Sequence, residues 1–199
     1  MQINDALNRI AEIHDHLDKC EVYRGYRALP VALSGLTALL GAVLQPYLTD
    51  PGATLVYILY WLNIAAINTL LCGSSILMCY LRDSNHRRRQ ARKTLGQFIP
   101  CLLACALITM VLLRIDLALA PILPGLWAIL FGLGIFSSRP YLPKAAGWIG
   151  VFYVTAGGVL LFLAPDAGLS PWSMGATFGF GQLAAAAMLY SGIERKAYD

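Results

Sequence analysis

Charged residues are scarce in this sequence, and they are missing from the middle of its long apolar runs. Aspartate, glutamate, lysine and arginine make up only 13% of the chain, while hydrophobic residues make up 58%. An ordinary soluble domain carries about 25% charged residues. This composition excludes a large soluble domain and predicts that most of the chain lies in a lipid bilayer.

The lack of ionisable side chains inside the runs also argues against several function classes. Intramembrane acids, bases and histidines mark proton relays and ion-coupled transport. Their absence argues against a proton-coupled transporter, an intramembrane metalloprotease and a haem protein with two histidine ligands. The common hydrolase, zinc-protease and nucleotide-binding motifs are missing too. We therefore rank an enzyme acting on lipid third, behind two non-enzymatic functions, and we expect no cofactor.

The cysteines give no sign of a catalytic or metal-binding site either. The five cysteines form no C-x-x-C pair, and four of them lie in apolar runs. We interpret them as small packing residues, and we expect no disulfide framework and no metal site. Residues 1–27 are polar and charged, so they do not match a signal peptide.

Six apolar stretches come after the polar N-terminal segment, and a membrane-spanning helix needs about 20 residues. The predicted spans are residues 28–48, 54–81, 95–113, 117–137, 147–163 and 170–193. We predict an all-α fold in which residues 28–199 form a single six-span transmembrane domain.

Lysine and arginine define an orientation for these spans. Among the 15 such residues, only Arg114 falls in a connection on one side of the predicted membrane. The others lie in the N-terminal segment, after the second and fourth spans, and at the C-terminus. Because cytoplasmic connections carry the excess of basic residues, we expect both termini in the cytoplasm.

Neutral polar residues recur on single faces of the predicted spans. On the second span, Trp61 and Asn68 share a face, and Gln182 lies on a small-residue face of the sixth. One interpretation is hydrogen bonding between helices. The alternative is a cavity for a lipid or small apolar ligand. The candidate cavity residues are Asn68, Gln182, Tyr153 and Trp61.

Two features are predicted on the cytoplasmic side. Ile3, Leu7, Ile10 and Leu17 have helical spacing, so residues 1–27 are expected to contain an amphipathic helix. Residues 3–26 would dock on the spans, pair in a homo-oligomer or bind a cytoplasmic protein.

The second feature is a dense basic run next to the third span. Such residues attract anionic lipid headgroups, although setting the topology alone would explain them. Nucleic acid is not an expected partner, because no aromatic residues interleave the run. The candidate headgroup residues are Arg87, Arg88, Arg89, Arg92 and Lys93.

Three strings resemble a family of small bacterial six-helix membrane proteins without an assigned activity. They are residues 24–30 (RGYRALP), 123–127 (LPGLW) and 178–182 (FGFGQ), the last continuing to Leu189-Tyr190. The resemblance covers nearly the full length and implies a bacterial inner-membrane location. Related chains carry histidine where this one has Gln182, which adds interest to that position.

Two functions are consistent with these patterns. The first is a non-enzymatic membrane protein that binds a lipid or small apolar ligand and acts as a sensor or scaffold for a cytoplasmic partner. The second is a channel or facilitator for a neutral small solute. A closed cavity beside Gln182 would favour the first, and a continuous polar path would favour the second.

Overall fold

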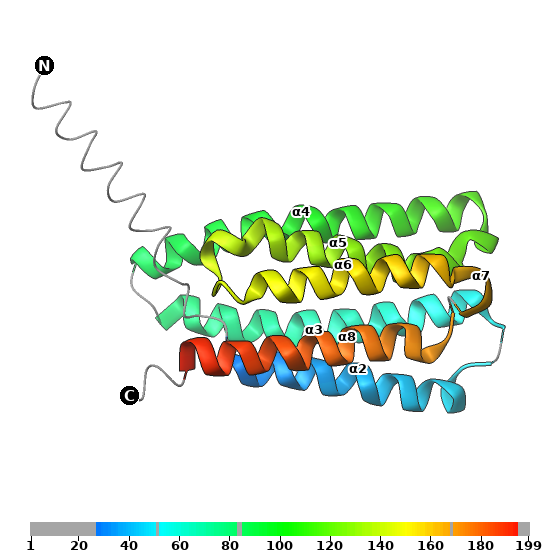
Figure 1. Ribbon diagram of the computed structural model, residues 1–199, viewed down its shortest axis with the longest axis horizontal. Coiled ribbons are helices and arrows are strands. Elements are labelled where there is room, and N and C mark those ends of the chain that lie inside the picture. The colour runs from blue at the N-terminus through cyan, green and yellow to red at the C-terminus, as the bar shows by residue number, and fades with distance from the viewer. Residues whose placement is uncertain (1–26, 51, 83–84, 168, 195–199) are drawn as a thin grey trace, which may run out of the picture.

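The computed structural model describes residues 27–50, 52–82, 85–167 and 169–194, and within these ranges the chain is helical and contains no strand. Within the described ranges, six helices of 16 or more residues run along the long axis of the bundle (Figure 1). They are α2 (Ala28–Leu48), α3 (Thr54–Arg82), α4 (Asn85–Ile115), α5 (Leu123–Ser138), α6 (Ala146–Phe162) and α8 (Pro171–Leu189). The prediction of an all-α fold is thus confirmed for the described residues.

Short helical segments complete the chain. They are the 3-10 helices η1 (Leu117–Ile122) and η2 (Arg139–Tyr141), the four-residue helix α7 (Ala164–Ala167) and the short π-helix η3 (Tyr190–Glu194). Asp116 begins η1, because its carboxylate accepts a hydrogen bond from the backbone nitrogen of Ala118 at 2.9 Å. Proline near the start of α5 suits the first helical turn, where its missing N–H is not needed.

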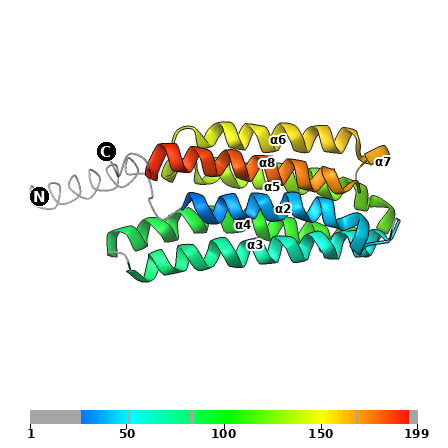
Figure 2. The same ribbon diagram turned by 90° about the horizontal axis from the view of Figure 1, so that it is seen from below.

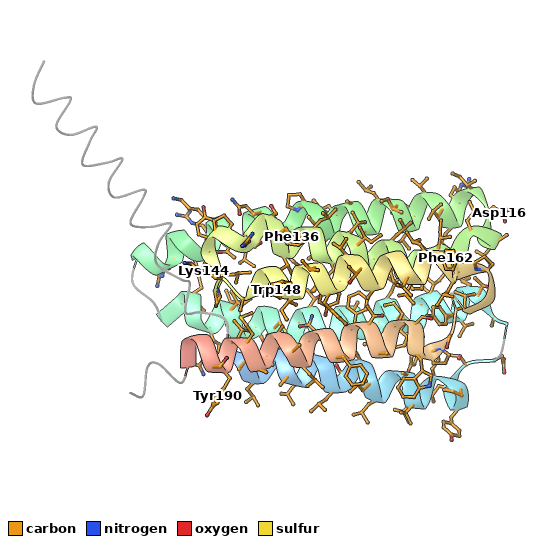
Figure 3. The ribbon with its side chains drawn as sticks, in the orientation of Figure 1. Asp116, Phe136, Lys144, Trp148, Phe162 and Tyr190 are labelled. Atoms are coloured by element: carbon orange, nitrogen blue, oxygen red, sulfur yellow. The ribbon has the colours of Figure 1, made fainter. Side chains whose placement is uncertain are left out.

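Successive long helices run in opposite directions, so their ends gather in two groups (Figures 1 and 2). The basic end, where α2, α4 and α6 begin, carries Arg27, Arg88, Arg92, Lys93, Arg139 and Lys144. The opposite end carries Asp50, Arg114 and Asp116. Figure 3 shows Lys144 and Asp116 at these two ends. The lysine and arginine residues that the sequence assigns to one side of the predicted membrane therefore lie together at one end of the bundle.

In the part of the chain that the structure describes, four helical segments are long and apolar enough to cross a membrane: Ala28–Leu48, Thr54–Met78, Ala91–Ile115 and Leu117–Tyr141. The other two predicted spans match less well in helix length or in apolar character. α6 has only 17 residues, and α8 has glycine, threonine and glutamine among its apolar residues. The outer surface is rich in large apolar side chains, including Phe162 at 85% exposure and Leu70 at 72%. A surface of this kind suits lipid better than water.

The main difference from the predicted spans lies at the start of α4. The apolar pattern predicts a third span from residue 95, but the helix begins at Asn85 and includes the basic run. Arginine, lysine and glutamine are good helix formers, so the helix continues beyond the apolar stretch. The predicted amphipathic helix at residues 3–26 lies outside the described residues.

Close packing of glycine faces joins the helices into two tight pairs. Between α2 and α8, a Cβ atom added to Gly35 would lie 2.9 Å from the carbonyl oxygen of Gly179. Between α5 and α6, a Cβ atom added to Gly157 would lie 2.7 Å from the carbonyl oxygen of Gly125. Any larger residue would force these backbones apart. Lipid tails are as apolar as the helix surfaces, so the hydrophobic effect does not bring helices together in a membrane. Close packing of small residues supplies the attraction instead.

Candidate functional site

Asn68 lies on α3, with its side chain against α2. The hydroxyl of Thr37 donates a hydrogen bond to Asn68 Oδ1 at 2.6 Å. Asn68 Nδ2 approaches the carbonyl oxygen of Ser34 at 3.4 Å. Both ends of the amide are therefore used between two helices, and among the described residues no hydrogen bond joins Asn68 to Gln182.

Trp61 makes a second contact of the same kind, nearer the end of the bundle opposite the basic end. Its indole Nε1 donates to Gln45 Oε1 at 2.8 Å, and both side chains are buried. One residue earlier, the hydroxyl of Tyr60 donates to the carbonyl oxygen of Gly41 at 2.8 Å. We call the contacts of Thr37, Gln45, Tyr60, Trp61 and Asn68 the polar seam. Each of these side chains finds a partner across the α2–α3 interface, so the seam works as packing.

Tyr153 occupies a different place, where α5, α6 and α8 meet. Its side chain is 0% exposed. The ring lies 4.8 Å from that of Phe131 and 5.4 Å from that of Phe178, measured between centroids. Phe98 of α4 joins through an edge contact with Phe131 at 5.2 Å. We call Phe98, Phe131, Tyr153 and Phe178 the aromatic cluster.

The hydroxyl of Tyr153 has no hydrogen-bond partner among the described residues, although it is fully buried. A Cβ atom added to Gly181 would lie 2.5 Å from this oxygen. The phenol head therefore fits only because α8 has glycine at that position. A buried polar group without a partner is costly, which makes this hydroxyl an exception to explain.

Two further amides stand close in sequence to residues of the aromatic cluster. Gln182 is half-buried, stands one helical turn after Phe178 on the same face of α8, and makes no hydrogen bond within the described part of the chain. Gln97 directly precedes Phe98, and its Oε1 atom is buried without a partner among the described residues. Tyr153 and Gln182 therefore offer polar atoms without a hydrogen-bond partner among the described residues, whereas the side chain of Gln97 leaves α4 about 100° around the helix from Phe98.

Gln97 is not among the residues that the sequence patterns predict. It is the only amide between Leu95 and Leu113, and that isolation is the signal that could have identified it. The signal is easily missed, because the basic run ends only four residues before Gln97. A glutamine so close to that run is readily assigned to the polar connection between two spans.

The structure separates the four predicted cavity residues into two groups. Trp61 and Asn68 belong to the polar seam and bond to α2. Tyr153 belongs to the aromatic cluster, and Gln182 lies next to it through Phe178. The second group alone offers unpaired polar atoms among apolar surroundings, so we take it as the candidate site.

The predicted headgroup residues differ in what surrounds them. The Arg88 guanidinium donates to the carbonyl oxygens of Tyr80 and Leu81 at 2.8 and 2.9 Å and stacks over the Tyr80 ring. It therefore caps the last turn of α3. Arg92 is exposed and Lys93 half-buried. The side chains of Arg87 and Arg89 lie outside the described residues.

Charge chemistry has little place at the candidate site. Its polar groups are the Tyr153 phenol and the Gln182 carboxamide, which donate and accept hydrogen bonds without carrying charge. Among the described residues, no group of three or more His, Cys, Asp or Glu side chains is placed to hold a metal ion. The arrangement suits recognition of a neutral oxygen or nitrogen atom on an apolar molecule.

Comparison of the chain with family models, curated proteins and solved structures gives no significant match. The resemblance to small bacterial six-helix membrane proteins therefore stays an expectation from the sequence, and the chain is assigned to no family.

Proposed function

We propose that this chain is a non-enzymatic integral protein of a bacterial inner membrane that binds a lipid or small apolar ligand. In this proposal it acts as a sensor or scaffold for a cytoplasmic partner. The apolar length of four helical segments and the large apolar side chains on the outer surface support insertion into a bilayer. The resemblance of the sequence supports the bacterial location.

The basic end is proposed to face the cytoplasm. It gathers positive side chains from three separate parts of the described chain, whereas the opposite end has Arg114 beside two aspartates. This distribution follows the rule that cytoplasmic connections are rich in lysine and arginine. Both chain termini would then be cytoplasmic, and exposed Arg92 would lie at the level of anionic lipid headgroups.

The observation that carries the ligand proposal is the buried hydroxyl of Tyr153, which is unpaired among the described residues. In a protein interior such a group is normally satisfied by protein or by a bound molecule. The aromatic cluster around it would contact an apolar body, and Gln182 would supply a second hydrogen bond. The expected ligand is therefore a neutral molecule with a long apolar part and one hydroxyl or carbonyl group.

The hydrogen bonds of the polar seam favour this proposal over a channel or facilitator for a neutral solute. A solute path needs polar groups that are free to exchange partners along its length. Asn68, Trp61 and Tyr60 instead bond to α2. A solute path between α2 and α3 would have to use the side chains of the polar seam. Those side chains instead hold the two helices together.

Ligand binding can be tested with two neutral probes, farnesol and 1-oleoylglycerol, added to the full-length protein in detergent micelles. We expect each probe to raise the thermal unfolding temperature in proportion to the logarithm of its concentration, because a ligand stabilises the state that it binds. Sodium oleate, whose charged head has no counter-charge at the site, should have a smaller effect.

Two variants make the test specific. Tyr153→Phe should lose most of the stabilisation by the neutral probes while remaining folded. Tyr60→Phe, a matched change whose lost hydrogen bond belongs to the polar seam, should keep it. Equal stabilisation of wild-type protein and Tyr153→Phe would reject the aromatic cluster as the binding site.

A further inference from the structure

The outward face of α3 has a regular pattern that the bundle does not use. Leu59, Asn63, Ala66, Leu70, Gly73 and Leu77 succeed one another at spacings of four, three, four, three and four residues. This is the 3.5-residue repeat with which one helix packs along another. All six residues are exposed, with Leu59 at 50%, Leu70 at 72% and Leu77 at 55%. Figure 2 shows α3 along an edge of the bundle.

Asn63 lies on this outward face, and lipid would leave part of the hydrogen-bonding capacity of its carboxamide unused. Its Nδ2 donates to the carbonyl oxygen of Leu59 in its own helix at 2.8 Å. Its Oδ1 accepts no hydrogen bond from the described residues. The outward hydroxyls of Thr69 and Thr155 differ, because each donates its single hydrogen to carbonyl oxygens of its own helix. These hydroxyls keep acceptor capacity only, whereas the Asn63 amide keeps both an acceptor oxygen and a second N–H hydrogen at a depth where lipid offers no partner for either.

We propose that two copies of this chain pair through the outward face of α3, with the Asn63 side chains hydrogen-bonded to each other. The proposal rests on the membrane insertion proposed above. Copies inserted in the same orientation are related by an axis along the membrane normal, so their α3 helices run parallel. Identical residues then meet at the same depth, and a carboxamide complements a second carboxamide because each has a donor and an acceptor.

Shape and length fit this occupant. The stretch from Leu59 to Leu77 is about 27 Å long, nearly the thickness of the hydrocarbon core. A Cβ atom added to Gly73 would meet nothing within 4 Å in the monomer, so the lack of a side chain there serves no contact inside the bundle. Ala66 and Gly73 instead let a second backbone approach, as small residues do at helix contacts in membranes. A single asparagine within such a repeat fixes the register of a parallel pair.

The experiment uses full-length protein labelled with donor or acceptor fluorophores and reconstituted into phosphatidylcholine vesicles. Energy transfer is measured as the protein-to-lipid ratio is lowered, and wild-type protein should show a saturable transition that unlabelled protein competes away. Asn63→Leu should weaken pairing by about tenfold, since one or two interhelical hydrogen bonds in a membrane are lost. Gly73→Leu should abolish pairing by blocking the approach of the helices.

Gly158→Leu on α6 is the matched control, because a Cβ atom there also meets nothing within 4 Å and the residue is exposed. It should pair like the wild type. Wild-type protein that stays monomeric, or pairing that Asn63→Leu and Gly73→Leu leave unchanged, would overturn the α3 pairing but not membrane insertion. Extraction of the protein from vesicles by alkaline carbonate would instead reject membrane insertion itself, and the pairing with it.

Discussion

The indole of Trp61 and the amide of Gln45 form a buried hydrogen bond of 2.8 Å that joins α3 to α2. The tryptophan is 2% exposed and the glutamine 5% exposed, so neither water nor lipid can replace the other partner. Around them lie Tyr57, Ile58, Leu123 and Trp127 of the main apolar core. The bond therefore fixes how α3 sits against the bundle at the end away from the basic residues.

Replacing Gln45 with leucine should destabilise the protein by about 1–2 kcal/mol, because the indole N–H would be buried without an acceptor. The measurement is the free energy of unfolding in mixed detergent micelles. Gln182→Leu is the comparison, since Gln182 makes no hydrogen bond within the described chain and its loss should change stability by less than about 0.5 kcal/mol. Equal losses in the two variants would contradict the assignment of Gln45 to packing.

The contact between Thr37 and Asn68 offers a cleaner comparison, because valine matches threonine in shape. Thr37→Val removes the 2.6 Å hydrogen bond to Asn68, together with the 2.9 Å approach of the same hydroxyl to the carbonyl oxygen of Ser34, and should cost about 1 kcal/mol. Thr69→Val removes only a bond from an exposed hydroxyl to its own helix, and should be nearly neutral. The same unfolding assay decides between them, and a neutral Thr37→Val would show that the seam contributes little to stability.

Adjacent glycines on α6 separate close packing from helix propensity. Gly157→Ala places a methyl group 2.7 Å from the carbonyl oxygen of Gly125, so we expect a loss of about 1–3 kcal/mol. Gly158→Ala meets nothing within 4 Å, and alanine is the better helix former, so that variant should be as stable as the wild type or slightly more so. If both variants lost stability alike, the α5–α6 contact would not depend on the glycine face.

Helix positions in this chain were largely predictable, because they depend on local apolar length and on proline. α2 occupies the predicted residues 28–48, and α3 ends one residue beyond its predicted limit. The start of α4 was not predictable from hydropathy. A helix extends as far as its backbone hydrogen bonds continue, whereas the apolar stretch extends only as far as the expected bilayer. The basic run lies between the start of α4 at Asn85 and the start of the apolar stretch at residue 95.

Partners of the polar side chains were much harder to predict. The spacing placed Trp61 and Asn68 on one face of α3, and both do turn toward a neighbouring helix. Which helix that is depends on how the spans are arranged around one another, and hydropathy carries no information on this arrangement. For the same reason the contact of Tyr153 with Gly181 could not be foreseen, since it depends on α6 and α8 being neighbours.

Removing the hydroxyl of Tyr153 should have the opposite effect from removing other tyrosine hydroxyls. In ligand-free protein, Tyr153→Phe deletes a buried oxygen that has no partner among the described residues, so it should leave the free energy of unfolding unchanged or raise it by about 1 kcal/mol. Tyr60→Phe deletes a hydroxyl that donates to Gly41 and should lower it by about 1 kcal/mol. The unfolding measurement is made after delipidation, because a bound molecule would supply the missing partner. A clear loss of stability in delipidated Tyr153→Phe would mean that the hydroxyl is already satisfied within the protein, and the case for a ligand at this position would fail.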